Sequence, residues 1–520
     1  AEASVVGEAQ LTVGGRRRSD CSVMTNDPAL IDDLIGRAAA YVRRPPGGDD
    51  PVVSLASPDA LRDTFEGSVG LSIGAEAVAH DRAAVLAAVD QVIEYSVHTS
   101  HPRFVNQNFA GPDPVAVAGD WLGAALNTTA ATYEAAPVFT MMESAVLTKL
   151  ARLAGYVSPV GDDLPALPPG LFCAGGSMGT LLALQLARHR HQPDVTTAGA
   201  NGDRLAVFVS ASGHYAATKS AALLGIGTDA VVAVATDHAG SIVPAALDAA
   251  IGEAIGEDRT PLAVIATAGT TVTSAFDDLS AVADVCEDSG LWLHVDGCYG
   301  GSALFSPHQA WRLRGVERSD SFVWNLHKMM GITQQCTALL VREPERLAAC
   351  FAARADYLFQ ADKLHADYDS GDRTFQCARR IDALKLWLTW KVRGDTGFAD
   401  RIEHAVAMAD HARATIAAGD GRFAPIVLGD FTNVVFAWVP PELRPLDLAA
   451  PDTLPDDVRA DLHGRPPRIK ARMQGNGSGL IGYQPVHGLN AFRMICMNPA
   501  LGTEDVDALL SAIDRAGLEG

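Results

Sequence analysis

The sequence predicts an α/β protein whose largest domain holds a mostly parallel sheet with helices on both faces. One observation is a series of short apolar runs. They are Arg204–Ser210, Val231–Ala235, Leu262–Thr267, Leu291–Val295, Ser321–Trp324 and Ala338–Val341. A second observation is that amphipathic segments such as TLLALQLARHRH and DLSAVADVCEDSG lie between several of these runs. Strands that are apolar throughout and alternate with helices are typical of a parallel sheet buried on both sides.

Helical patterns flank this region. The first two dozen residues lack periodicity and predict a flexible leader, and helical patterns follow it. Beyond about residue 375, Ile381, Leu384 and Leu388 share one helical stripe. Near the end of the chain, Thr503 is expected to cap a helix. The apolar stripe of that helix is Val506, Leu509, Leu510 and Ile513.

We therefore predict three parts. Residues 1–104 form the leader and an N-terminal helical segment, residues 105–387 a large α/β domain, and residues 388–520 a small α+β domain. A chain of 520 residues is long enough for two or three domains.

Composition excludes several classes of protein. The chain carries 62 acidic and 41 basic residues and a formal charge of −21, which disfavours nucleic-acid binding. No apolar run reaches the roughly 18 residues of a membrane helix. The eight cysteines show neither C-x-x-C nor a paired metal spacing, so we expect a reduced, cytoplasmic protein without a metal site. Arg16, Arg17 and Arg18 precede polar residues and are interpreted as part of a solvated tail rather than an export signal.

Chemically active side chains follow the ends of four predicted strands. His214 follows the first run, Thr267, Thr270 and Thr271 end or follow the third, Asp296 follows the fourth, and Lys328 comes shortly after the fifth. Ligands of open α/β sheets bind at the carboxyl ends of the strands. The sequence therefore predicts that an imidazole, hydroxyls, a carboxylate and an amine meet at one rim.

Lys328 and Asp296 suggest a particular chemistry. The chain has only seven lysines, and a lysine at a strand end can form a covalent bond with an aldehyde cofactor. A carboxylate buried at a strand end needs a cationic partner, and a protonated pyridine nitrogen is one. A structural ion pair is the alternative for Asp296 taken alone. The expected proximity of Lys328 and His214 favours a pyridoxal phosphate site.

The glycine-rich turn at 175–180, GGSMGT, precedes a predicted helix. Free backbone N–H groups and the Ser177 hydroxyl at such a helix start can hold a phosphate. This signal is weak alone, because glycines are common at helix starts. The turn matches neither the G-x-G-x-x-G nor the Walker pattern, so nucleotide binding is disfavoured.

From about residue 65 to residue 515 the chain resembles the group II pyridoxal-phosphate-dependent decarboxylases, which include glutamate, cysteine sulfinate and aspartate decarboxylases. The segments that carry the resemblance are HPRFVNQNFAG, NTTAATYEAAPVFTMME, GGSMGT, SGHYAATKSAALLGIG, ATAGTTVTSAFDD, HVDGCYGGSALFS, WNLHKMMGITQQCTALLV, YDSGDRTFQCARRIDALKLWLTWK and FRMICMNP. The resemblance implies fold type I, pyridoxal 5'-phosphate as cofactor, and a homodimer whose active sites lie at the subunit interface.

Position by position, the resemblance implies roles for residues around the cofactor. Lys328 would bind the cofactor covalently, Asp296 would pair with the pyridinium nitrogen, and His214 would stack on the ring. Gly176, Ser177 and His327 would lie at the phosphate, and Thr267 near the ring substituents.

The resemblance also implies two residues that act on the substrate. Arg493 would bind its α-carboxylate, and Tyr357 would be the mobile-loop tyrosine that protonates the substrate carbon after carbon dioxide leaves. The reaction implied is α-decarboxylation of an amino acid.

The chain departs from the usual family pattern around the cofactor. Asp-Ala-Ala-Trp is replaced by Asp296-Gly297-Cys298-Tyr299, and Asn-Pro-His-Lys by Asn325-Leu326-His327-Lys328. Gly179-Thr180 stands where Ser-Asn is common. We expect Gly297 to remove a methyl group from beneath the ring, which leaves room for an altered cofactor tilt or an unusual substrate.

The strip at residues 106–111 matches the segment that lines the side-chain pocket in the family, with Gln107 and Phe109 as candidate substrate contacts. A phenylalanine at position 109 is similar to what the sulfinate and aspartate decarboxylases have at this position, whereas the glutamate enzymes have a small polar residue there. A bulkier wall shortens the pocket, so aspartate or cysteine sulfinate is favoured and glutamate stays a further candidate.

Two other functions stay open from the sequence. The first is a pyridoxal phosphate enzyme with another reaction outcome, such as transamination or decarboxylation-dependent oxidation, which could use the same ring contacts. Such an enzyme could also act on an unusual amino acid in a biosynthetic pathway. A non-catalytic paralogue is the second alternative, and the joint presence of Lys328, Asp296 and Arg493 argues against it.

Overall fold

The computed structural model describes residues 28–73, 82–158, 164–355, 357–360 and 362–519. The expected leader and Arg16–Arg18 lie outside these residues. The described chain forms two compact units, which are considered separately. The first unit contains the helices α1 (Pro28–Arg43), α2 (Pro58–Glu66) and α3 (Arg82–Tyr95). Ion pairs between Arg37 and Asp90 and between Arg82 and Asp33 join α1 to α3.

The second unit, residues 45–55 and 96–520, contains a seven-stranded sheet in the order β2-β8-β7-β6-β5-β3-β4. Its strands are β2 (Gly170–Cys173), β3 (Leu205–Ser210), β4 (Val231–Val234), β5 (Thr260–Thr267), β6 (Trp292–Asp296), β7 (Ser321–Asn325) and β8 (Thr337–Val341). Strands β7, β6, β5, β3 and β4 are parallel, whereas β8 is antiparallel to both β7 and β2. All six predicted strands are present, and the mostly parallel α/β sheet is confirmed.

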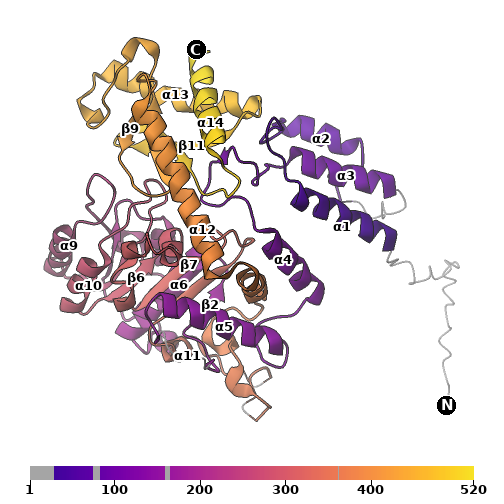
Figure 1. Ribbon diagram of the computed structural model, residues 1–520. Coiled ribbons are helices and arrows are strands. Elements are labelled where there is room, and N and C mark those ends of the chain that lie inside the picture. The colour runs from indigo at the N-terminus through magenta and orange to yellow at the C-terminus, as the bar shows by residue number, and fades with distance from the viewer. Residues whose placement is uncertain (1–27, 74–81, 159–163, 356, 361, 520) are drawn as a thin grey trace, which may run out of the picture. The chain divides into compact units, whose positions relative to one another are not determined.

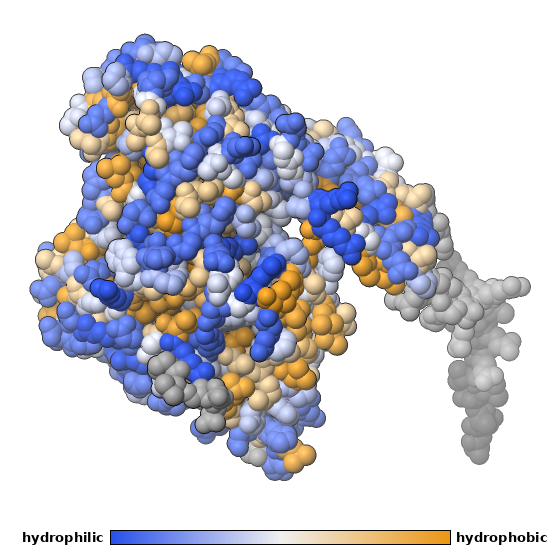
Figure 2. Space-filling view, in the orientation of Figure 1, coloured by the Kyte–Doolittle hydropathy of each residue, from blue (hydrophilic) through white to orange (hydrophobic). Residues whose placement is uncertain are grey.

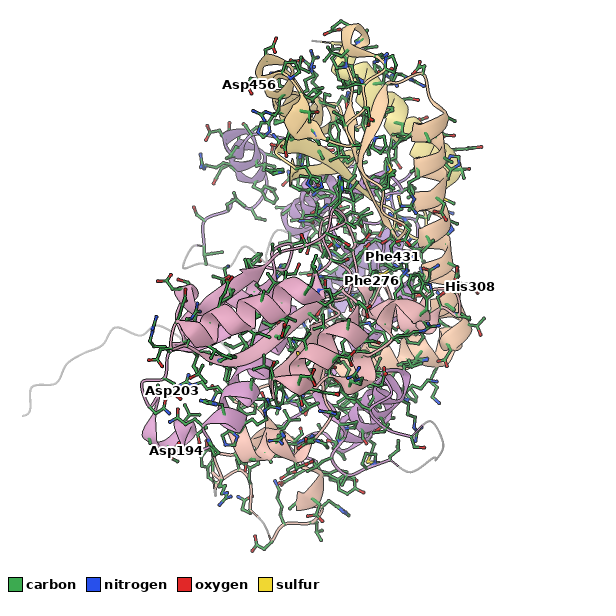
Figure 3. The ribbon with its side chains drawn as sticks, turned by 90° about the vertical axis from the view of Figure 1, so that its left-hand side faces the viewer. Asp194, Asp203, Phe276, His308, Phe431 and Asp456 are labelled. Carbon is green, nitrogen blue, oxygen red and sulfur yellow. The ribbon has the colours of Figure 1, made fainter. Side chains whose placement is uncertain are left out.

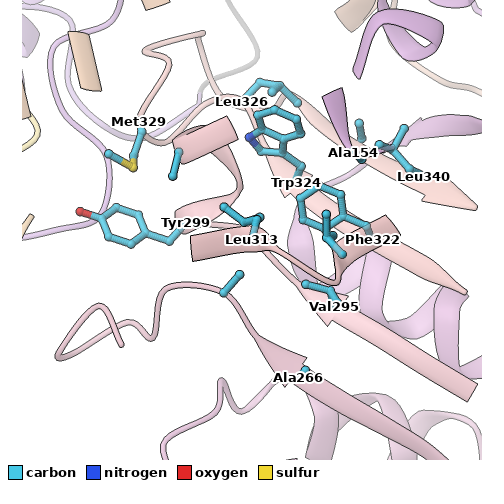
Figure 4. Packing of buried hydrophobic residues seen from close by; sticks show 14 of the residues in the cluster. Ala154, Ala266, Val295, Tyr299, Leu313, Phe322, Trp324, Leu326, Met329 and Leu340 are labelled. Atoms are coloured by element: carbon cyan, nitrogen blue, oxygen red, sulfur yellow. The ribbon is translucent and has the colours of Figure 1, made fainter. Parts of the chain in front are cut away.

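Helices cover both faces of this sheet (Figure 1). Helices α5 (Pro137–Leu153), α9 (Pro244–Gly256) and α10 (Leu279–Asp288) pack on one face. Helices α6 (Gly176–His191), α8 (Ala216–Leu223) and α11 (Glu345–Phe351) pack on the other. Figure 4 shows Phe322, Trp324 and Leu340 in the core beneath the first face. Burial on both faces explains why these strands are apolar throughout.

A second sheet of five strands has the order β1-β11-β12-β10-β9. The strands are β1 (Phe104–Val105), β9 (Phe423–Val427), β10 (Asn433–Trp438), β11 (Leu480–Val486) and β12 (Leu489–Ile495). The remaining helices of the unit are α4 (Pro114–Leu126), α7 (Val195–Ala198), α12 (Asp382–Ala418), α13 (Asp456–Gly475) and α14 (Thr503–Leu518). Short 3-10 helices lie at Thr228–Ala230, Gly300–Phe305, Ala310–Leu313, Val316–Arg318, Ala366–Tyr368, Gly371–Arg373, Pro441–Leu443 and Pro451–Thr453.

The long helix α12 joins the regions of the two sheets (Figure 1). It packs against α4 and α5, and also against β9 and α14. At Gly394 the backbone leaves the helical conformation, with φ of 68°, which kinks the helix. Phe276 and Phe431 pack edge to face, with ring centroids 5.1 Å apart, where the two sheets approach each other (Figure 3).

Two sequence predictions for the C-terminal part need correction in detail. The stripe of α14 is fully buried, as expected, but the helix is capped by Gly502 rather than Thr503, with the Gly502 N–H donating to Asp505. In α12 Leu388 is only partly buried, whereas Leu386 is completely buried, because the helix packs against neighbours on more than one side.

The predicted domain boundaries stay predictions, and both fall inside regular elements, β1 and α12. In the described part of the chain, no helix combines the length and apolar character needed to cross a membrane.

Candidate active site

A cavity of about 160 Å³ lies at the carboxyl end of the parallel strands. It is lined by Gly176, Ser177, His214, Ala216, Thr267, Gly269, Thr271, Asp296, Cys298, Tyr299, Asn325 and Lys328. Thr267 at the end of β5 is in register with Asp296 at the end of β6. The structure thus brings together seven of the residues that the sequence predicted: Gly176, Ser177, His214, Thr267, Thr271, Asp296 and Lys328.

Asp296 presents a buried carboxylate to this cavity. Among the described hydrogen bonds, its side chain accepts only the backbone N–H of Cys298, at Oδ1 and 3.0 Å. Within the described residues Asp296 forms no ion pair, although the residue is only 9% exposed. The neighbouring His294 does not supply a positive charge, because burial lowers its pKa to about 4. A cation inside the cavity would offset the desolvation cost of Asp296.

His214 forms another wall of the cavity. Its Nδ1 accepts the backbone N–H of Ala216 at 3.2 Å, so the neutral ring carries its proton on Nε2. Burial lowers the pKa of His214, with an opposing effect from Asp296. A neutral imidazole held in this way presents a flat face suited to stacking on an aromatic ring.

The start of α6 is suited to binding an anion. Among the described hydrogen bonds, the backbone N–H groups of Gly176 and Ser177 have no acceptor, as expected for the first turn of a helix. A Cβ atom at position 176 would lie only 2.2 Å from Cys298 Sγ. Glycine therefore lets the helix start approach the cavity wall closely. The free N–H groups and the helix dipole favour a phosphate here.

Cys298 and Tyr299 occupy the positions where this chain departs from the usual family pattern. Both line the cavity, and Gly297 does not. A Cβ at position 297 would lie 2.2 Å from Cε2 of Phe322, on the packed side of the sheet. The expectation that Gly297 opens space beneath the ring is therefore wrong. Cys298 and Tyr299, rather than position 297, therefore shape this part of the cavity.

Arg493 lies next to the cavity but not in its wall. On β12, its Nη1 donates to the backbone oxygen of Thr271 at 2.9 Å, and Thr271 lines the cavity. Asn433 also donates to that oxygen, at 3.1 Å, and its Oδ1 accepts the hydroxyl of Tyr299 at 3.1 Å. A continuous network thus connects Tyr299 in the cavity wall to Arg493 through Asn433 and Thr271.

The structure does not bring the other predicted residues to the cavity. His327 and Phe109 line a separate cavity of about 180 Å³. Nδ1 of His327 lies 2.9 Å from the backbone oxygen and 3.1 Å from the backbone nitrogen of Cys336, and burial lowers the His327 pKa to about 4. Gln107 is exposed, and Tyr357 is 84% exposed. The roles of these four residues stay predictions.

Sequence reasoning did not single out Asn325 and Tyr299 as site residues. A signal for Asn325 was present, because it ends β7, the neighbour of β6, two residues beyond the Val323 that pairs with Asp296. Tyr299 was noted only as a departure from the usual tryptophan, and no local pattern indicates that its hydroxyl reaches Thr432 and Asn433.

The fold and cavity define a pyridoxal-phosphate enzyme of the decarboxylase class, and comparison with known proteins agrees. Residues 72–439 match the model described as the pyridoxal-dependent decarboxylase conserved domain. The chain therefore belongs to the pyridoxal-dependent decarboxylase family, and pyridoxal phosphate is its cofactor.

Several curated proteins are similar to this chain over most of its length. Cysteine sulfinic acid decarboxylase of Rattus norvegicus is 40% identical over 495 residues, which cover 94% of this chain and 96% of the relative. Acidic amino acid decarboxylase GADL1 of Bos taurus is 41% identical over 437 residues, 83% of this chain and 81% of the relative.

Solved structures are similar as well. The crystal structure of mouse CSAD aligns with a TM-score of 0.85 at 39% identity and covers 94% of this chain and 98% of that one. The structure of Oryza sativa TDC with PLP and tryptamine, at 24% identity and a TM-score of 0.82, covers 95% of this chain and 97% of that one and supports the fold alone.

The residues around the cavity fit this cofactor. Its positive ring nitrogen would pair with the buried carboxylate of Asp296, and its phosphate would meet the free N–H groups of α6. When bound, pyridoxal phosphate supplies an electron sink for cleavage of a bond at the substrate's α-carbon. The protein is accordingly a carboxy-lyase acting on amino acids.

Proposed function

We propose that the protein removes the α-carboxylate of a short acidic L-amino acid, cysteine sulfinate or aspartate, and releases the amine and carbon dioxide. The main support is the single cavity that contains Lys328, Asp296 and His214. The names of the similar curated proteins support an acidic substrate.

The proposed roles around the cofactor follow from charge and position. The Lys328 amine would hold the cofactor covalently through its aldehyde. Asp296 would pair with the ring nitrogen and favour its protonated form, which would stabilise negative charge at the substrate carbon. His214 would stack on the ring, Thr267 would contact its substituents, and Gly176 and Ser177 would hold the phosphate. His327, which lines a separate cavity, would act on the phosphate side only from behind this wall.

The proposed roles toward the substrate involve residues outside the cavity wall. Arg493 binds the substrate carboxylate, and Tyr357 returns a proton to the carbon after carbon dioxide leaves. Its exposed position is compatible with a loop that closes over the substrate and excludes water.

Substrate size is set, in this proposal, by Phe109 with Gln107. Phe109 packs near Phe104 with ring centroids 6.0 Å apart, which supports its side chain as a firm wall. One methylene in such a pocket is worth roughly 1–3 kcal/mol, so glutamate is expected to be the poorer substrate.

We propose that the active form is a cytoplasmic homodimer with active sites at the interface. Helix α4 supports this association, because Trp121, Leu122 and Leu126 are between 40% and 51% exposed. Figure 2 shows apolar side chains gathered over this part of the surface. Gln107, Phe109 and Tyr357 also stand away from the cavity in one chain, where a second chain could complete the site. Free cysteines at all described cysteine positions agree with a reducing compartment.

The experiment is an assay of carbon dioxide release from a panel of L-amino acids, with the second product identified. Amine formation from aspartate or cysteine sulfinate, faster than from glutamate, supports the proposal. A ketone or peroxide would refute simple decarboxylation, and faster turnover of glutamate would refute the size argument. Borohydride trapping of the cofactor on Lys328 checks the covalent role, with Lys391→Met as a control.

A further inference from the structure

Two cations converge on Asn106, just after β1. Nζ of Lys470, on α13, donates to Oδ1 of Asn106 at 3.0 Å. Nη2 of Arg493, on β12, donates to the backbone oxygen of the same residue at 3.0 Å. The substrate-binding arginine therefore has a second positive charge as its neighbour.

Neither cation has an acidic partner within the described residues. The ion pairs there include neither Lys470 nor Arg493, and Nε of Arg493 is buried with no hydrogen-bond partner. Burial lowers the pKa of both groups, and Arg493 lowers the pKa of Lys470 further. Two adjacent cations that are partly buried carry a desolvation and repulsion cost that an anion would relieve.

A glycine on the neighbouring strand allows Arg493 and Asn106 to approach each other closely. Gly482 on β11 lies opposite Arg493 in the sheet register. A Cβ at position 482 would lie 3.2 Å from the backbone oxygen of Asn106 and 3.5 Å from Nη2 of Arg493. A side chain at position 482 would therefore crowd Asn106 and the Arg493 guanidinium that donates to it.

We propose that Lys470 is a specificity-determining residue that binds one acidic group of the substrate while Arg493 binds the other. This inference rests on the proposed function, in which the substrate is an acidic amino acid. The formal charge of −21 repels an acidic substrate at long range. A local pair of cations can attract a substrate with two acidic groups in spite of this repulsion.

A purely structural role for Lys470 makes different predictions. The lysine also lies 5.8 Å from the ring centroid of Tyr483 and could merely hold α13 against Asn106. Such a role would affect stability and the binding of all carboxylates alike. A subsite would discriminate between ligands with one and with two acidic groups.

The test compares Lys470→Met, Lys470→Arg and Lys391→Met with the wild type. Lys391 is an exposed lysine on α12, so its replacement makes the same change in net charge away from Asn106. Binding of succinate, with two carboxylates, and of propionate, with one, is measured by calorimetry, and KM and kcat for cysteine sulfinate and aspartate by carbon dioxide release.

We expect Lys470→Met to weaken succinate binding and raise KM by about tenfold or more, with propionate binding and kcat changed by less than about threefold. Lys470→Arg should retain most of the affinity, and Lys391→Met should match the wild type. Unchanged succinate binding in Lys470→Met, or equal weakening of both acids, would overturn the subsite. If the wild type binds succinate through Lys470 but decarboxylates no acidic amino acid, the proposed function fails and the subsite stands.

Discussion

Gly176 offers a direct test of how the start of α6 is held against the cofactor cavity. A Cβ at this position would lie 2.2 Å from Cys298 Sγ, more than 1 Å inside the shortest ordinary van der Waals contact. It would also lie 3.1 Å from Nδ2 and 3.2 Å from Oδ1 of Asn325. The substitution Gly176→Ala must therefore displace either α6 or the segment after β6.

Overpacking of this kind costs about 1–3 kcal/mol. Both segments line the cavity, so the displacement of either one is expected to weaken cofactor binding by part of this free energy. A loss of about 1.4 kcal/mol corresponds to a tenfold increase in the dissociation constant of pyridoxal phosphate. The measurement is an absorbance titration of the cofactor-free protein, together with its thermal midpoint.

Removal of the opposing sulfur supplies the control. Cys298→Ala in the Gly176→Ala background removes the closest contact, so the double variant should recover much of the lost affinity. The contact with Asn325 persists, so recovery should be incomplete. The reasoning is refuted if Gly176→Ala binds the cofactor as the wild type does, or if the two substitutions act additively.

Two further predictions concern buried hydrogen bonds and pH. Tyr299→Phe leaves Thr432 and Asn433 without the phenol hydroxyl, so we expect the free energy of unfolding to fall by about 1–3 kcal/mol. We also expect KM to rise while the absorbance of the bound cofactor stays unchanged. An unaltered KM would contradict the hydrogen-bond network that connects Tyr299 to Arg493. Burial lowers the His294 pKa from 6.5 to about 4, so the unfolded chain takes up the proton before the folded protein does as the pH falls. The free energy of unfolding should therefore decrease by up to about 3 kcal/mol between about pH 6.5 and pH 4. Thermal midpoints measured across this range should fall less steeply in His294→Gln, and equal slopes would show that His294 does not contribute.

Much of the large sheet could be predicted from local sequence patterns. Each of the six apolar runs is a strand, and the polar residues after them meet at one edge because parallel strands end on the same side. Strand β2 was not predicted, since GLFC directly follows a proline-rich stretch that is typical of a loop. The antiparallel direction of β8 was also not predictable, because the apolar pattern of a buried strand is the same in either direction.

Side-chain direction limited the prediction of the site itself. Lys328, Asp296 and His214 could be placed at the rim from their positions after strands. Whether Gly297 or Cys298 lines the cavity depends on how the backbone turns after β6, and residue spacing does not specify that turn.

The sequence by itself determined the strand and helix periods, the chemical groups available at the strand ends, and the family to which the chain belongs. These features depend on neighbouring residues and on recurring motifs. Tertiary structure alone decided that Lys470 and Arg493 both contact Asn106, since they lie 364 and 387 residues beyond it. The physical reason is that β1 pairs with β11 in the C-terminal sheet, a long-range pairing that no local pattern records.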